Sequence, residues 1–187
     1  MRESIGGTWL LGFIITFVVL FASFLAYAIS YTKAFNMKSE ILNFIERGEG
    51  YTDSTNSDLE NMSDAALKED LSVEAQAFSL IKKSGYNYKA ASNVDCSRYG
   101  HTGEEALKVG GYCVTKYCPG METIIDPNTG NSMPVAGTDS KTYYKVTTFI
   151  AMKLPILEVT MSIPVTGETR TLFFDQSNGM ECVKYAD

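Results

Sequence analysis

The chain has 187 residues and carries 16 basic against 22 acidic side chains, which gives a formal net charge of −6. An acidic balance of this size excludes nucleic-acid binding through a broad basic surface. No internal repeat is visible, and the polar sequence that follows one apolar run is long enough for a single compact domain.

The first element is an uncharged apolar run from Trp9 to Ile29. At about 1.5 Å per residue, about 21 helical residues extend about 31 Å, which is close to the hydrocarbon thickness of a bilayer. A helix satisfies its own backbone hydrogen bonds in lipid, so one span is physically complete. We therefore expect a short cytoplasmic tail at residues 1–8, a transmembrane helix at residues 9–29, and the lipid bilayer as a partner.

A cleavable signal peptide is the alternative interpretation of this run. Such signals have a basic leading segment and an apolar stretch of about 7 to 15 residues. The run here is longer, and the charged side chains before it are Arg2 and Glu3. Ala26-Tyr27-Ala28 has the small-x-small form of a cleavage site. Trp9 and Tyr31, however, suit the two interfacial aromatic belts of a retained anchor.

The helical pattern continues past the membrane into residues 30–48. Apolar residues recur there at three- and four-residue spacing, which predicts an amphipathic stalk helix continuous with the span, with Gly48 as its C′ residue. Two interpretations of this apolar stripe are open. It packs on the protein's own domain, or it packs beside copies or partners in an assembly, and both can hold. The candidates for an assembly face are Tyr31, Phe35, Ile41, Leu42 and Ile45.

Residues 49–187 predict an extracytoplasmic α+β domain. Ser72 is positioned to cap a second helix that ends at Ser84, before Gly85. Alternating apolar and polar residues then predict an antiparallel β-meander, and a loop-rich region lies between 93 and 140. The expected strands are 86–91, 111–117, 143–154, 157–165 and 168–174.

Cysteine usage indicates the compartment of this domain. An even number of cysteines outside the membrane predicts two disulfides in an oxidising compartment, with three pairings open. Reduced thiols are the alternative; a zinc site is disfavoured because there is no CxxC pair and a single His. The positive-inside rule is nearly balanced here, so the cysteines decide for a cytoplasmic N-terminus. The disulfide candidates are Cys96, Cys113, Cys118 and Cys182.

No catalytic constellation stands out in the sequence. His101 lies between Cys96 and Cys113, but a disulfide-bonded cysteine is no nucleophile, and a loop position is the simpler interpretation of this His. Residues 126–131 carry alternating oxygen ligands and a glycine, yet a calcium loop's glycine at the sixth position and glutamate at the twelfth are missing, so a turn is expected. We therefore expect no enzymatic activity, no metal and no cofactor.

Short stretches of the chain resemble one family of pilin-like proteins. The start from Arg2 to Leu10 and the exit from Tyr31 to Phe35 resemble the anchor of TadE-like pseudopilins, which belong to tight-adherence (Tad/Flp) pilus systems. Tyr144–Ile150, Leu154–Ile156 and Ile163–Thr169 look like the paired strands of that family around a Leu-Pro connection. The resemblance implies a pilin-like α+β fold and a non-catalytic accessory subunit of a bacterial surface pilus or related secretion machine.

The sequence departs from processed pilins at the cleavage point. Those proteins carry a Glu at the fifth mature position, where cleavage after Gly12 places Phe17 and cleavage after Gly7 places Gly12. No processing residue is therefore transferred. The resemblance implies other pilin-like or pilus-assembly subunits as partners of the N-terminal helix. The alternative function is a membrane-tethered extracellular binding or sensor module built on the loops from Cys96 to Cys118.

The topology is testable by protease protection. Protease added to intact spheroplasts is expected to digest the chain after Ser30 and to leave the short N-terminal tail, because the domain is expected outside the membrane. Survival of the domain while an outer control protein is cut would show the opposite orientation.

Overall fold

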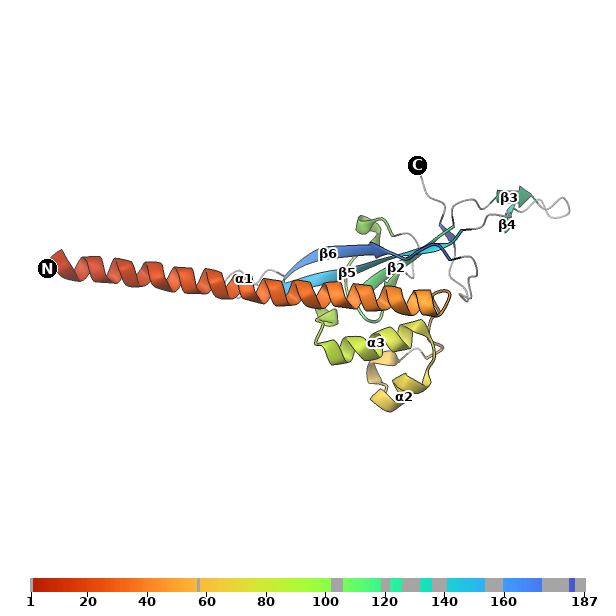
Figure 1. Ribbon diagram of the computed structural model, residues 1–187, viewed down its shortest axis with the longest axis horizontal. Helices are drawn as coiled ribbons and strands as arrows, with labels where there is room; N and C mark the ends of the chain where they lie inside the picture. Colours follow the sequence, from red (N-terminus) through yellow and green to blue (C-terminus); the bar gives the residue numbers. More distant parts are fainter. Residues whose placement is uncertain are drawn as a thin grey trace.

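A computed structural model describes residues 2–56, 58–101, 106–118, 122–125, 132–135, 141–153, 160–172 and 182–183. Within this part the chain forms one long N-terminal helix, a group of short helices and an antiparallel sheet, which agrees with the expected α+β class. The long helix projects far beyond the domain (Figure 1). The α-helices are α1 (Arg2–Arg47), α2 (Asp64–Glu69) and α3 (Val73–Ser84).

Helix α1 is continuous from the apolar run into the stalk, as the sequence predicts. Its N-terminal part stands free of the domain, and its C-terminal part lies along strands β5 and β6 (Figure 1). By length and composition it is suited to cross a membrane, and it is the one such helix among the described residues.

One face of the C-terminal part of α1 closes the main core. Ala34, Met37, Ile41 and Ile45 follow one another at three- and four-residue steps, and each is at most 2% exposed. They pack with α3 and with the apolar face of the sheet. The hydroxyl of Thr148 on β5 donates to the Ala34 carbonyl at 2.9 Å, which ties the strand to the helix.

Helix α1 ends at Arg47, as expected, but its left-handed C′ position lies one residue later than predicted. Glu49, not Gly48, has a positive φ, of 51°. The Gly48 N–H donates to the Phe44 carbonyl at 2.9 Å, and the Gly50 N–H donates to the Ile45 carbonyl at 3.0 Å. These bonds satisfy carbonyls of the last turn, so the left-handed C′ position falls on Glu49. The prediction of Gly48 as the C′ residue is therefore wrong.

The helices that follow α1 match the sequence only in part. The Ser72 side chain accepts from the Ala75 N–H at 3.2 Å and caps α3, as predicted, and Gly85 ends it with a φ of 66°. Helix α2 was not predicted, although Ser63, whose side chain caps it, is a helix start signal in the sequence. The predicted strand 86–91 is wrong, because a 3-10 turn, η2, occupies Tyr88–Ala90. Two further 3-10 turns are η1 (Leu59–Asn61) and η3 (Cys96–Tyr99).

The sheet has the order β1-β2-β5-β6. These four strands are antiparallel, but β7 pairs with β2 in parallel, which the expected meander does not include. A separate β3–β4 hairpin lies in the predicted loop-rich region. The strands are β1 (Leu107–Lys108), β2 (Tyr112–Tyr117), β3 (Glu122–Ile125), β4 (Ser132–Val135), β5 (Tyr143–Lys153), β6 (Thr160–Glu168) and β7 (Cys182–Val183).

Three expected strands correspond to this sheet. Those at 111–117, 143–154 and 157–165 correspond to β2, β5 and β6, although residues 154–159 lie outside the described part. The expected strand 168–174 is not formed within the described residues, where Leu172 makes an isolated bridge with Thr142; residues 173 and 174 lie outside them.

The four cysteines form two disulfides, as the sequence predicts. Cys96 joins Cys113, and Cys118 joins Cys182 over 64 residues of sequence. The first bond holds η3 against the sheet face opposite α1, where a second core contains Ala91, Ala106 and Phe149. The second bond holds β7 beside β2. Helix α1 thus packs on one sheet face and the disulfide-linked loop on the other.

The core role of α1 predicts a large effect at Ile41. Ile41→Ala is expected to lower the free energy of unfolding by about 3 kcal/mol, because it leaves a cavity in a fully buried site. Phe35→Ala, on the exposed side of the same helix, is the matched control and is expected to change it by less than about 1 kcal/mol. Denaturant unfolding of the full chain in detergent measures both. Equal effects would contradict the placement of Ile41 in the core.

Candidate functional site

The N-terminal part of α1 is an apolar surface that the described part of the domain leaves uncovered. Every side chain from Thr8 to Ala26 is exposed, and Trp9, Phe17 and Phe24 are 81%, 64% and 64% exposed. Leaving so many large apolar side chains in water costs on the order of tens of kcal/mol. This surface therefore requires lipid or other apolar helices around it.

Three hydroxyl side chains, within the apolar run and just beyond it, bond to the backbone of α1 itself. The hydroxyls of Thr16, Ser23 and Thr32 each donate to the backbone carbonyl four residues earlier, at 2.8–2.9 Å. A hydroxyl that bonds within its own helix presents little unsatisfied polarity to hydrocarbon. The three residues are therefore compatible with an apolar environment.

A row of aromatic rings follows where α1 meets the domain. Tyr27, Tyr31 and Phe35 repeat every four residues, with ring centroids 6.4 and 6.3 Å apart. The Lys38 ammonium lies 4.2 Å from the centroid of the Phe35 ring. Tyr27 is half-buried against the main core, whereas Tyr31 and Phe35 are 45% and 43% exposed. This row lies beside the sheet-facing residues and stays accessible to a partner.

The structure divides the five candidates for an assembly face. Ile41 and Ile45 are fully buried in the protein's own core, so their side chains are not available to a partner of the folded domain. Leu42 is half-buried, and Gly167 of β6 approaches it so closely that a Cβ there would come within 2.9 Å of its Cδ1. Tyr31 and Phe35 remain as the accessible members.

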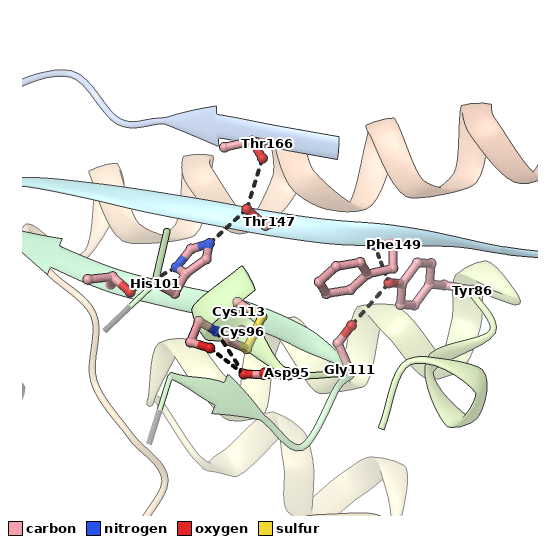
Figure 2. The surroundings of a disulfide bond; sticks show 11 residues. Tyr86, Asp95, Cys96, His101, Gly111, Cys113, Thr147, Phe149 and Thr166 are labelled. Atoms are coloured by element: carbon pink, nitrogen blue, oxygen red, sulfur yellow. Dashed lines mark hydrogen bonds between the residues drawn. A yellow bond between two sulfur atoms is a disulfide. The ribbon is translucent and has the colours of Figure 1, made fainter. Parts of the chain in front are cut away.

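His101 lies in a loop, as expected, but its imidazole is buried on the sheet. Nδ1 lies 2.8 Å from the Thr115 hydroxyl and Nε2 lies 2.7 Å from the Thr147 hydroxyl, which in turn lies 3.0 Å from the Thr166 hydroxyl. Figure 2 shows this chain of side chains running from the loop across β5 to β6. The imidazole thus joins the loop directly to β2 and β5, and through Thr147 to β6.

This geometry gives His101 a structural role. Burial, helped by the nearby Lys145 charge, lowers its pKa to about 4, so the ring is neutral at physiological pH. Both ring nitrogens are engaged by hydroxyls, and Cys96 and Cys113 are bonded to each other. A Cys–His catalytic pair is therefore absent from this site.

A second set of buried polar side chains lies near the C-terminal end of α1. The Tyr51 and Tyr112 hydroxyls are 2.9 Å apart, and the Lys108 ammonium lies 2.5 Å from Asp53 and 5.2 Å from the Tyr51 ring centroid. Glu74 accepts from the Ser54 N–H at 3.0 Å.

Burial controls the protonation of this group. It raises the pKa of Glu74, and it raises the pKa of Tyr51 and Tyr112, which keeps both phenols neutral. The group joins the segment after α1 to α3 and to the β1–β2 turn. Sequence reasoning missed it, because the Tyr51–Tyr112 and Asp53–Lys108 contacts join residues 61 and 55 positions apart that follow no periodic pattern.

Tyr86 supplies a similar structural link on β5. Its hydroxyl accepts from the Phe149 N–H at 2.9 Å and donates to the Gly111 carbonyl at 3.1 Å (Figure 2). Phe149 lies beyond the end of the β2 pairing, so the phenol takes the place of a neighbouring strand. Burial raises the pKa of Tyr86 to about 12, which keeps the hydroxyl a donor.

Metal and ligand chemistry finds little support in the described part. No group of three His, Cys, Asp or Glu side chains is arranged there to hold a metal ion. The calcium-like stretch 126–131 lies outside the described residues. An open groove between α1, α2 and α3 has an apolar floor that includes Phe44 and Leu80, with Lys68 and Lys83 among its lining residues.

Comparison of the chain with protein-family models, with curated proteins and with solved structures gave no match. The functional argument therefore depends on the geometry of α1 and of the domain that it carries.

The buried imidazole predicts a pH dependence of stability. Its folded pKa of about 4 is below the ordinary value of 6.5, so between these values the unfolded chain binds a proton that the folded chain does not. Stability is fully present above pH 6.5 and falls by up to about 3 kcal/mol as the pH drops to 4. Denaturant unfolding of the wild type at several pH values, in detergent, measures the loss.

His101→Gln is the matched variant, because an amide also donates and accepts but does not titrate. The difference in unfolding free energy between wild type and variant is expected to shrink as the pH falls from 6.5 to 4. The carboxylates are common to both proteins, so their contribution to the pH dependence of the unfolding free energy cancels in this difference. A constant difference over this pH range would show that the imidazole does not resist protonation.

Proposed function

We propose that the protein is a non-catalytic accessory pilin- or pseudopilin-like subunit of a bacterial surface pilus or related secretion machine. Its single transmembrane helix holds the N-terminus in the cytoplasm and the disulfide-bonded domain outside. In the assembly, the exposed apolar part of α1 packs beside the helices of other subunits.

The observation that carries the proposal is the division of α1 into two surfaces. The N-terminal part, from Thr8 to Ala26, is exposed all round, whereas Ala34, Met37, Ile41 and Ile45 are buried in the domain. One rigid helix thus belongs to two environments. A subunit that waits in a bilayer and then joins a helical filament needs the same two surfaces, because neighbouring helices replace lipid around the same residues.

The chemistry of the domain supports a structural role. His101, Glu74 and the buried tyrosines have perturbed pKa values, but burial explains them and their hydrogen-bond partners lie within the fold. The two disulfides support an oxidising compartment for the domain, and hence the proposed orientation.

The alternative, a membrane-tethered binding or sensor module, depends on a pocket in the loops from Cys96 to Cys118. In their described part these loops cover the sheet with Cys96, Ala106 and Cys113 in a small core of their own. That packing supports a stabilising role for the loops, so the subunit hypothesis is preferred.

Photocrosslinking in the native bacterium tests the proposal. A photoreactive amino acid at Phe17 or at Tyr31 is expected to yield adducts with other protein subunits, because both side chains are exposed on α1. The same probe at Leu71, which is 84% exposed but lies on the domain, is the control for random collisions. Adducts with lipid alone at both α1 positions would contradict the proposal.

A truncation experiment adds a functional measurement. Tyr31→Ala/Phe35→Ala removes the accessible rings and leaves the core intact, whereas Leu71→Ala is the exposed control. Losing aromatic anchors from an interface typically costs about 2 kcal/mol or more, so recovery of the partners crosslinked by the probe at Phe17 is expected to fall about tenfold or more. Normal recovery and normal surface filaments in the double variant would favour the tethered binding module.

A further inference from the structure

The groove between the C-terminal part of α1, α2 and α3 is an apolar surface that the described fold does not fill. Its volume is about 380 Å³, which is at the lower end of the range for small-molecule sites. Phe44, Leu67 and Leu80 give each of the three helices an apolar side chain in the lining. Leu71, which also lines the groove, is 84% exposed, and outside α1 it is the one large apolar side chain with such exposure among the described residues. Figure 1 shows α3 beside α1, with α2 next to α3.

The Ser79 hydroxyl adds a buried polar group to this apolar lining. Ser79 is 8% exposed and lies in the wall of the groove. Its hydroxyl makes no hydrogen bond within the part of the chain that the structure describes, whereas Ser72 and Ser84, at the two ends of α3, both bond to the backbone. A buried hydroxyl without a partner is costly, so an acceptor on a ligand would offset that cost.

Two lysines make the lining cationic. Lys68 on α2 and Lys83 on α3 are exposed, and no Asp or Glu lines the groove among the described residues. Neither ammonium has an ion pair or hydrogen bond within that part of the chain, whereas the adjacent Lys82 donates to the Glu60 and Met62 carbonyls at 3.0 and 3.1 Å. In a chain of net charge −6, two unpaired cations beside an apolar surface favour an anionic ligand.

The spacing of the polar groups favours a carboxylate on an apolar chain. Ser79 and Lys83 are four residues apart on α3, so their side chains lie on one face of the helix. One carboxylate can therefore accept from the hydroxyl and from the ammonium together. The neighbouring apolar side chains then receive an aliphatic chain. A phosphate or sulfate ion would leave that apolar surface unused.

The groove faces water and not the hydrocarbon layer. Lys33 donates to the Gly85 carbonyl at 3.3 Å, so the end of α3 that carries Lys83 is nearer the membrane. Phe44 lies fifteen residues beyond Ile29, or about 22 Å along the helix axis. The acyl chains of bilayer lipids therefore do not reach this part of the lining. A ligand enters the groove from the aqueous side as a free molecule.

We propose that the groove between α1, α2 and α3 binds a free medium-chain fatty acid. The carboxylate accepts hydrogen bonds from Ser79 and Lys83, and the aliphatic chain lies against Phe44 and Leu80. This site goes beyond the proposed function and does not depend on it, because the side chains that form it belong to the domain and to the part of α1 that packs on the domain.

Photolabelling of the full chain in phosphatidylcholine vesicles tests the site. The probe is decanoate that carries a diazirine in its chain, and peptide mass spectrometry locates the adducts. Adducts are expected on residues 64–84, and an excess of unlabelled decanoate is expected to reduce them about tenfold. Decanol, which has the same chain without the charge, is expected to compete about tenfold more weakly than decanoate.

Two variants test the contacts with the carboxylate. Lys83→Gln removes the charge and Ser79→Ala removes the hydroxyl, and each is expected to raise the probe concentration that half-saturates labelling of residues 64–84 about fivefold. Lys89→Gln changes an exposed lysine outside the groove, so it is the matched control and is expected to leave that concentration unchanged. Ser79→Ala is also expected not to lower the unfolding free energy of the ligand-free protein, which distinguishes a ligand contact from a structural role.

A second probe distinguishes a free fatty acid from a bilayer lipid. Phosphatidylcholine with the same diazirine in an acyl chain is expected to label α1 and not residues 64–84. Equal labelling of residues 64–84 by this lipid would overturn the inference, because the acyl chain would then come from the bilayer.

Three further results would also overturn it. They are decanoate labelling confined to α1, labelling of residues 64–84 that unlabelled decanoate does not reduce, and unchanged half-saturation in both Lys83→Gln and Ser79→Ala. None of these outcomes alters the expected subunit adducts at Phe17 and Tyr31, so the site and the proposed function fail independently.

Discussion

The structure depends on helix α1, because its C-terminal part is packed in the domain core and its N-terminal part is apolar and exposed. Helix α1 contributes Ala34, Met37, Ile41 and Ile45 to the main core, so the domain cannot form its sheet-facing core without it. The same helix carries exposed apolar side chains from Trp9 to Phe24, which water does not tolerate. Because α1 is one continuous helix, the position of the domain is coupled to the position of the exposed apolar part of α1.

The two disulfides and the buried polar contacts stabilise the side of the domain that α1 does not reach. Cys96–Cys113 fixes the loop that covers the outer sheet face, and His101 joins that loop to β2 and β5 through threonine hydroxyls. A small apolar core alone gives limited stability, and a cross-link that closes a long loop typically adds about 2–4 kcal/mol. The domain therefore combines helix packing on one face with covalent links on the other.

This division also explains why titratable groups in the domain do not indicate catalysis. Each is buried for a structural reason: His101 between strands, Glu74 under the segment after α1, and Tyr86 where β5 continues beyond its pairing with β2. A perturbed pKa marks a functional site only when the group faces a cleft and a reacting atom. The apolar and aromatic side chains of α1, by contrast, are accessible.

The sequence alone determined the continuous helix, the Ser72 cap, the three main strands and the presence of two disulfides, because apolar periodicity, caps and cysteine count are local signals. Only the tertiary structure decided the cysteine pairing, the parallel β7 and the 3-10 turn at Tyr88–Ala90. It also divided the stalk stripe, burying Ile41 and Ile45 and leaving Tyr31 and Phe35 accessible. Periodicity shows that a helix has an apolar face, but the direction from which a distant sheet approaches decides which of its residues are covered.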